Sequence, residues 1–78
     1  MKISLAQLRA ARAMLAWTSE YLAHRARVHR HTVCKLERGK AAPQRATLAR
    51  IVAALEAGGV EFTGAGGVQP KAPKSSFQ

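Results

Sequence analysis

Residues 17–39 read WTSEYLAHRARVHRHTVCKLERG, and this stretch decides the fold. Its first half predicts a helix that starts at Thr18, because a threonine hydroxyl can cap the free backbone N–H groups of a helix start. Trp17 before the cap and Leu22 at the fourth helical position are placed for a hydrophobic staple. The apolar side continues to Ala26, so we expect a short helix that ends there.

The second half of the stretch, from Arg30 to Arg38, predicts another short helix with two different sides. At about 100° per residue, Val33 and Leu36 fall together on an apolar side. The opposite sector carries Arg30, His31, Cys34, Lys35 and Arg38. A three-residue break precedes this helix and ends with His29 in the capping position, and Gly39 follows as the residue that ends the helix. A capped helix, a tight turn and a helix with a face of hydrogen-bond donors make up the helix-turn-helix layout.

Two further helices are expected on either side of this pair. The first runs from about Ser4, a plausible N-cap, to Ala16. Its apolar face is formed by Leu5, Leu8, Ala11 and Leu15. The other runs from about Arg45 to Ala57, and Gly58 and Gly59 end it. Its apolar residues recur at i, i+3, i+4 and i+7, and they are Leu48, Ile51, Val52 and Leu55. The sequence therefore predicts a compact, all-α, four-helix domain over residues 1–59.

A short β-prone arm follows the last predicted helix. Residues 60–63 alternate apolar and polar side chains like a strand, residues 64–67 are rich in glycine, and residues 68–69 could pair back. We interpret residues 60–69 as a β-hairpin that serves dimerisation, and the alternative is a flexible arm. Residues 70–78, with two prolines and two lysines, are predicted to be a disordered tail.

Positive charge is the strongest feature of the composition. Thirteen Lys and Arg against four Asp and Glu give a formal net charge of +9. Most of the basic residues lie between Arg25 and Arg45, where Glu37 is the only acid. Such a surface repels itself, and nucleic acid is its usual partner in a small domain. From this charge we expect a protein that binds double-stranded DNA. Because the sequence has no signal peptide and no apolar run of ~18–20 residues, we also expect it to be soluble and intracellular and to bind no membrane.

The single cysteine and its neighbouring histidines raise the question of a metal site or a catalytic thiol. A structural metal site needs four convergent ligands, whereas the helix from Arg30 to Arg38 offers only His31 and Cys34 on one side, among cations. His29 is expected to point away from His31. A His31–Cys34 thiolate couple would lack a cleft and an orienting third group, and no paired carboxylates are present. We therefore expect no metal, no cofactor, no small-molecule substrate and no enzymatic activity.

An ordered series of residues runs through all four predicted helices. It consists of Leu8-Arg9-x-x-Arg12, Trp17-Thr18-x-Glu20-x-Leu22-Ala23-x-x-Ala26, Val28, Thr32-Val33-x-x-Leu36-Glu37-x-Gly39, Pro43 and Thr47-Leu48. This pattern resembles the Xre/Cro-type helix-turn-helix domain of phage repressors and bacterial transcription regulators. Each element alone is weak, but the ordered set spans residues 8–55. The resemblance implies a repressor-like fold.

The resemblance also implies roles for individual residues. In this family an arginine of the first helix pairs with a glutamate near the end of the recognition helix, so we expect Arg12 and Glu37 to form a bidentate ion pair. The base-reading positions that it implies are Arg30, His31 and Lys35, with Cys34 beside them. The phosphate-binding positions are Thr18, Ser19, His29, Arg38, Lys40 and Arg45. For each of these residues, an independent surface side chain is the alternative interpretation.

The chain departs from the family pattern at three positions. Ser19 stands where the family usually has glutamine, which removes a long amide that could reach phosphate. Arg27 stands where the turn usually has glycine, and a non-glycine residue at positive φ costs ~1 kcal/mol. His29 stands where serine or threonine usually caps the third helix, and histidine is a poorer cap. We expect the fold to survive these changes with some loss of stability.

The leading interpretation is a Cro-like transcriptional repressor that binds DNA as a symmetric homodimer. Two recognition helices placed one helical turn apart, ~34 Å, read a palindromic operator. We expect the dimer surface to include Leu55, Val60 and Phe62. Such a protein, encoded by a bacterium or a phage, would act on the nucleoid in the cytoplasm. The alternative is an antitoxin or accessory protein that binds DNA while its C-terminal arm folds on a partner protein.

Overall fold

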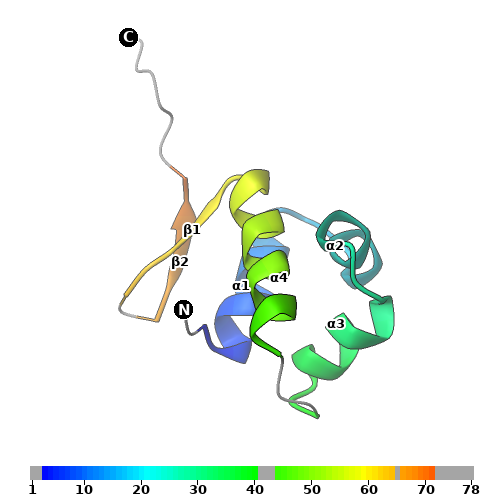
Figure 1. Cartoon of the computed structure of the whole chain (residues 1–78). Coiled ribbons are helices and arrows are strands. Elements are labelled where there is room, and N and C mark those ends of the chain that lie inside the picture. The colour runs from blue at the N-terminus through cyan, green and yellow to red at the C-terminus, as the bar shows by residue number, and fades with distance from the viewer. Residues whose placement is uncertain (1–2, 41–43, 65, 72–78) are drawn as a thin grey trace, which may run out of the picture.

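In the residues that it describes, the computed structural model of the chain has four α-helices and a two-stranded antiparallel hairpin (Figure 1). The structure describes residues 3–40, 44–64 and 66–71. The helices are α1 (Leu5–Met14), α2 (Ser19–Ala26), α3 (Arg30–Glu37) and α4 (Arg45–Gly58), and the strands are β1 (Val60–Phe62) and β2 (Val68–Pro70). The predicted four-helix, all-α fold with a short C-terminal β arm is confirmed. Within these residues, no helix has both the length and the apolar character that a membrane crossing requires.

The first two helices begin where local capping chemistry directs them. Ser4 Oγ accepts a hydrogen bond from the Gln7 backbone N–H at 3.1 Å, and Gln7 Oε1 accepts one from the Ser4 N–H at 2.8 Å. This reciprocal arrangement is a capping box. Thr18 Oγ1 accepts a hydrogen bond from the Tyr21 N–H at 2.9 Å. The predicted caps of α1 and α2 are therefore both confirmed.

The turn between α2 and α3 contains a left-handed residue that is not glycine. Arg27 ends α2 at φ 60° and ψ 44°, the backbone conformation for which a glycine is preferred. A side chain in this conformation costs about 1–2 kcal/mol, because its Cβ approaches the following carbonyl oxygen. Ala16, just before α2, lies at φ 56°, a second such position that the sequence did not reveal. The turn thus keeps a tight geometry at some cost in stability.

The core lies where the four helices and the hairpin meet, with α2 packed against both α3 and α4 (Figure 1). Its largest fully buried side chains are Leu22, Val33, Ile51, Leu55 and Val60. At the end of α4, a Cβ added to Gly58 would lie 2.7 Å from the indole ring of Trp17. Gly58 therefore lets the indole pack against the helix end, and Gly59 ends the helix at φ 118°.

The hairpin packs against α1 and α4, on the side of these helices away from α3 (Figure 1). Its strands pair in the register Val60–Pro70, Glu61–Gln69 and Phe62–Val68. Gln7 Nε2 donates a hydrogen bond to the Gly67 carbonyl at 3.0 Å and ties the hairpin to α1. Pro70, which was expected to begin the tail, belongs to β2. Residues 72–78 of the predicted tail and residues 41–43 of the loop before α4 lie outside the described residues.

The packing of the hairpin changes the expected dimer surface. Leu55 is 0% exposed and Val60 is 1% exposed, because β1 closes the core beside α4. Neither side chain is available to a second chain in this fold, so these two assignments are corrected. Phe62 is half-buried against the same core and keeps some accessible surface.

Candidate nucleic-acid interface

Helix α3 separates its side chains into a buried side and an exposed side. Val33 is 0% exposed and Leu36 is 8% exposed, because both pack into the core. The outward side carries Arg30, His31, Cys34, Lys35 and Arg38, all of which are exposed except the half-buried Cys34. One shallow groove on this side is lined by His31, Cys34, Lys35 and Arg38, together with Lys40, which follows the helix. The structure thus brings the residues predicted to read bases to one solvent-facing surface, which we call the α3 donor face.

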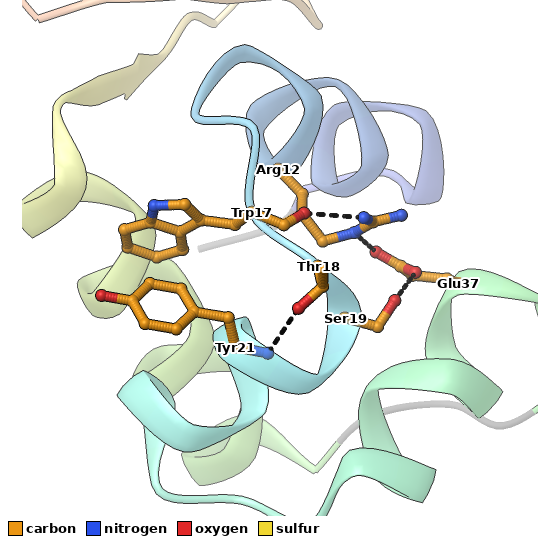
Figure 2. Close-up of polar contacts among 6 residues, drawn as sticks. All are labelled: Arg12, Trp17, Thr18, Ser19, Tyr21 and Glu37. Atoms are coloured by element: carbon orange, nitrogen blue, oxygen red, sulfur yellow. Dashed lines mark hydrogen bonds and ion pairs between the residues drawn. The ribbon is translucent and has the colours of Figure 1, made fainter.

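A polar network fastens the inner side of α3 to α1 and to the start of α2 (Figure 2). Arg12 Nε donates a hydrogen bond to Glu37 Oε2 at 2.6 Å, and Ser19 Oγ donates one to Glu37 Oε1 at 2.9 Å. A terminal guanidinium nitrogen of Arg12 donates to the carbonyl oxygen of Trp17 at 2.9 Å. One carboxylate at the end of α3 therefore holds both neighbouring helices.

The network satisfies two charges that are largely withdrawn from water. The Glu37 side chain is 9% exposed and the Arg12 side chain is 25% exposed. Such charges are costly unless they are paired and hydrogen-bonded, and here each carboxylate oxygen has a donor. The pairing is not the expected bidentate one: Arg12 bonds Glu37 through Nε alone, while Nη1 donates to Trp17 and the other carboxylate oxygen accepts from Ser19. The position of α3 is thus set by a network of three hydrogen bonds that joins α1, the start of α2 and α3, and not by one ion pair alone.

The two residues expected to contact phosphate from the start of α2 have different surroundings. Thr18 is exposed, and its hydroxyl oxygen caps the helix. The Ser19 hydroxyl donates its single proton to Glu37, so this side chain serves the internal network. The backbone N–H of Ser19, in the first turn of α2, is the group that remains for a phosphate.

His29 caps α3 with its side chain. Its Nδ1 accepts a hydrogen bond from the His31 backbone N–H at 3.1 Å, which confirms its predicted place at the helix start. The centroids of the two imidazole rings lie 4.8 Å apart, with the ring planes at 59°. The expectation that the two histidines point apart is therefore wrong, because the cap draws His29 back over the first turn. Among the described residues, no three His, Cys, Asp or Glu side chains form a group that could hold a metal ion.

The other basic candidates are exposed charges in two separate places. Arg30 Nη1 lies 3.8 Å from Glu20 Oε2. Both side chains are more than half exposed, so this ion pair is weak. Arg38 and Lys40 border the groove on the α3 donor face. Arg45 begins α4 and lines a different depression, with Leu48, Ala49 and Val52. Arg38 and Lys40 therefore belong to the α3 donor face, whereas Arg45 lines a different depression.

Several contacts around the site were not predicted from the sequence. The hydrogen bond of Ser19 joins residues 18 positions apart, and no local pattern signals it. The carbonyl of Trp17 likewise becomes an acceptor only because α1 and α2 meet at this point. By contrast, the capping role of Gln7 could have been predicted from the sequence, because Ser4-x-x-Gln7 is a capping-box signature.

A family model described as "Helix-turn-helix domain" matches residues 5–63 of the chain. The match runs from α1 through β1, so it includes the α2–α3 pair, the network around Glu37 and the α3 donor face. No curated protein sequence matches the chain. The matched family is a DNA-binding family, typically without enzymatic activity. Together with the capped α2, the tight turn and the outward-facing donors of α3, this match shows that the chain belongs to the helix-turn-helix domain family.

Proposed function

We propose that the chain is a sequence-specific DNA-binding transcription regulator of the Xre/Cro type, which represses by occupying its operator on the bacterial nucleoid. The observation that carries this proposal is the α3 donor face. Arg30, His31 and Lys35 are exposed on a helix whose other side is fixed by Glu37. Donors on a helix held in one place can discriminate between base edges, because their positions are set before binding. The net charge of +9 supplies the attraction to phosphate.

In this proposal α3 lies in the major groove of the duplex. Arg30 and His31 approach the bases from the first turn of α3, and Lys35 approaches from one turn further along. Arginine and lysine donate to guanine O6 and N7, and a histidine N–H can donate to the same acceptors. Because this face carries donors and no carboxylate, we expect each half-site to contain guanine. Cys34 lines the same groove as His31 and Lys35.

Contacts to the sugar–phosphate backbone would position α3 along the groove. The start of α2 offers the backbone N–H groups of a helix N-terminus to one phosphate. Exposed cations after α3 reach the backbone on the other side. The complete set of proposed phosphate contacts is Thr18, Ser19, His29, Arg38, Lys40 and Arg45. These contacts contribute affinity without sequence preference, and they make binding depend on salt.

A homodimer completes the proposal, because one α3 spans only a few base pairs. Two copies with their α3 helices ~34 Å apart would read a palindrome. Since Leu55 and Val60 are buried, we place the dimer contact at the accessible part of the hairpin around Phe62. Pro70 in β2 has no N–H, so it cannot donate to an added strand. Side-chain packing around Phe62 is therefore favoured over strand pairing along β2.

The competing function is an antitoxin or accessory protein whose C-terminal arm folds on a partner. The hairpin of this chain already packs on its own α1 and α4, and Val60 is part of the core. No contact of the hairpin specifically favours that alternative, so we retain the DNA-binding regulator as the proposed function.

Selection of bound duplexes from a random DNA library tests this function. The full chain should enrich one guanine-containing motif, arranged as two inverted half-sites about 10 base pairs apart. Sedimentation of the complex should show two chains for each duplex. Failure of the folded protein to enrich any motif would refute sequence-specific binding. Enrichment of a single half-site bound by one chain would support sequence-specific DNA binding but refute the homodimer.

A further inference from the structure

A groove separate from the α3 donor face lies between α2 and α4, which pack side by side (Figure 1). Its volume is about 460 Å³. It is lined by Arg25 and Arg27 at the end of α2 and by Arg50, Ala53 and Ala57 on α4. None of these residues lines the groove on the α3 donor face. The proposed reading of DNA by α3 therefore leaves this second groove without a role.

The groove between α2 and α4 is positively charged and has no acid of its own. Its three arginines are exposed, and in the part of the chain that the structure describes no ion pair involves them. None of the chain's four glutamates lines the groove. The two that form ion pairs, Glu20 and Glu37, do so with other arginines. Neighbouring arginines repel one another, and a partner that brings carboxylates relieves this repulsion.

Arg25, which lines the groove from the α2 side, is held in place by two aromatic side chains. The guanidinium carbon of Arg25 lies 5.1 Å from the centroid of the Trp17 ring, and a nitrogen of this guanidinium donates to the Tyr21 hydroxyl at 3.0 Å. The Trp17 and Tyr21 rings meet edge to face, with centroids 5.0 Å apart (Figure 2). Tyr21 is still 42% exposed. Tyrosine and arginine dominate binding at protein interfaces, and side chains held in place lose little entropy on binding.

The apolar lining of the groove, which we call its floor, consists of four alanines: the buried Ala26 and Ala54, and Ala53 and Ala57. Ala53 and Ala57 are exposed one turn apart on α4, and their methyl groups let the side chains of another helix approach closely. The phosphates of a duplex bind N–H donors and gain nothing from a methyl floor. An apolar floor between arginines instead matches a helix with one apolar stripe and carboxylates on its flanks. These features favour a protein over a nucleic acid as the occupant.

We propose that the groove between α2 and α4 docks an acidic amphipathic helix of a partner protein. The apolar stripe of that helix packs on Ala53 and Ala57, and its carboxylates pair with the arginines on both sides. Because the two grooves share no residue, one chain can hold DNA on α3 and the partner helix between α2 and α4. The docking site does not depend on the proposed DNA-binding function.

An NMR titration of the full chain with a designed peptide tests the docking site. The probe is a helical peptide of about 18 residues, or five turns, with a stripe of alanine and leucine flanked by glutamates. A control peptide carries lysine in place of each glutamate. The glutamate peptide should shift the backbone amides of Tyr21, Arg50 and Ala53 and leave those of His31 and Lys35 unchanged. The lysine peptide should shift none of them.

Matched variants separate the groove from general charge attraction. Arg50→Glu should weaken binding of the glutamate peptide about tenfold, because it places a like charge beside the carboxylates. Arg9→Glu changes the net charge equally at an exposed position of α1 and should leave the affinity within about twofold. Ala53→Leu should weaken binding by filling the floor, whereas Ala46→Leu, in the first turn of α4, should not. Circular dichroism confirms that each variant is folded.

Four results would overturn the docking site. The first is an absence of amide shifts with the glutamate peptide. The second is equal weakening by Arg50→Glu and Arg9→Glu, which would show attraction to net charge alone. The third is a set of peptide-induced shifts on His31 and Lys35, which would place the peptide on the α3 donor face. The fourth is a loss of affinity for a random-sequence duplex in Arg50→Glu as large as the loss for the peptide, which would assign the groove to DNA.

Discussion

Helix α3 carries charged side chains on both of its sides, but the surroundings of those charges differ. On the inner side, Glu37 is 9% exposed and accepts hydrogen bonds from Arg12 and Ser19. On the outer side, Lys35 and Arg38 are exposed, and the 3.8 Å pair of Arg30 with Glu20 lies in solvent. The inner charge is satisfied within the chain and holds the helix in place. The outer charges are available to a polyanion. Their contribution to the recognition of bases depends on the inner contacts that orient α3.

Removal of Arg12 should have the largest effect on stability. Arg12→Met leaves the carboxylate of Glu37 in a largely buried place with only the Ser19 hydroxyl as a side-chain donor, so we expect a loss of about 3 kcal/mol in the free energy of unfolding. For a domain of this size, the melting temperature should fall by more than about 10 °C. Thermal and urea unfolding followed by circular dichroism measure the change.

Two controls accompany this variant. Arg9→Met removes an exposed arginine from the same helix and should change stability by no more than about 0.5 kcal/mol. The double variant Arg12→Met, Glu37→Leu should recover much of the lost stability, because no charge is then left without its partner. An unchanged melting temperature for Arg12→Met would show that the inner charges do not hold α3.

Removal of an outer charge should give the opposite pattern. Arg30→Ala should cost ~1–3 kcal/mol of DNA affinity at one base position, because the contact to that base is lost. Its free energy of unfolding should stay within about 0.5 kcal/mol of that of the unmodified chain, since the side chain is exposed. Arg38→Ala should instead weaken binding to all sequences and reduce the salt dependence. Competition binding at two salt concentrations separates the two cases, and a large loss of stability in Arg30→Ala would remove the distinction between the two sides.

The turn that leads into α3 should respond to a glycine. Arg27→Gly relieves a side chain from φ 60° and should raise the free energy of unfolding by about 1 kcal/mol, after the greater entropy of glycine in the unfolded chain is counted. Arg27→Ala keeps the left-handed side chain and removes the same charge, so it should bring no such gain. If alanine stabilised the chain as much as glycine, charge repulsion rather than backbone strain would be the cost at this turn.

The cap of α3 should give the smallest effect. His29→Ser replaces an imidazole nitrogen by a hydroxyl, which is a preferred capping group, so we expect a gain of about 0.5 kcal/mol. Chemical unfolding measures it, with His24→Ser as a control at an exposed histidine inside α2. A loss of stability in His29→Ser would show that the contact between the two imidazole rings contributes more than the cap does.

The helices and most of their ends could be predicted from the sequence, because they depend on local chemistry. Helical periodicity places Val33 and Leu36 inward, and a hydroxyl before α2 caps it. The meeting of Arg12 and Glu37 could be expected only from the resemblance to a family, since no spacing rule joins residues 25 positions apart. Fold and donor face were therefore within reach of the sequence.

The remaining contacts depend on how distant elements meet. Ser19 matched a phosphate-binding position by order along the chain, but its hydroxyl turns inward because Glu37 lies beside it in space. Val60 was expected at the dimer surface, but the hairpin folds back on α1 and α4 and buries it. Alternation of apolar residues indicates that a strand has a buried face, but it does not indicate whether its own chain or a second one covers that face.

The reading of bases by α3 is tested most directly by the specificity profile of Lys35→Ala. Binding to every single-base variant of the selected operator is measured for this variant and for the unmodified chain, together with the melting temperature of each. We predict that the preference relaxes at one position of each half-site, with ~1–3 kcal/mol lost there, unchanged preferences elsewhere and an unchanged melting temperature. An equal loss of affinity on all sequences would contradict the account, because Lys35 would then contact phosphate and not a base.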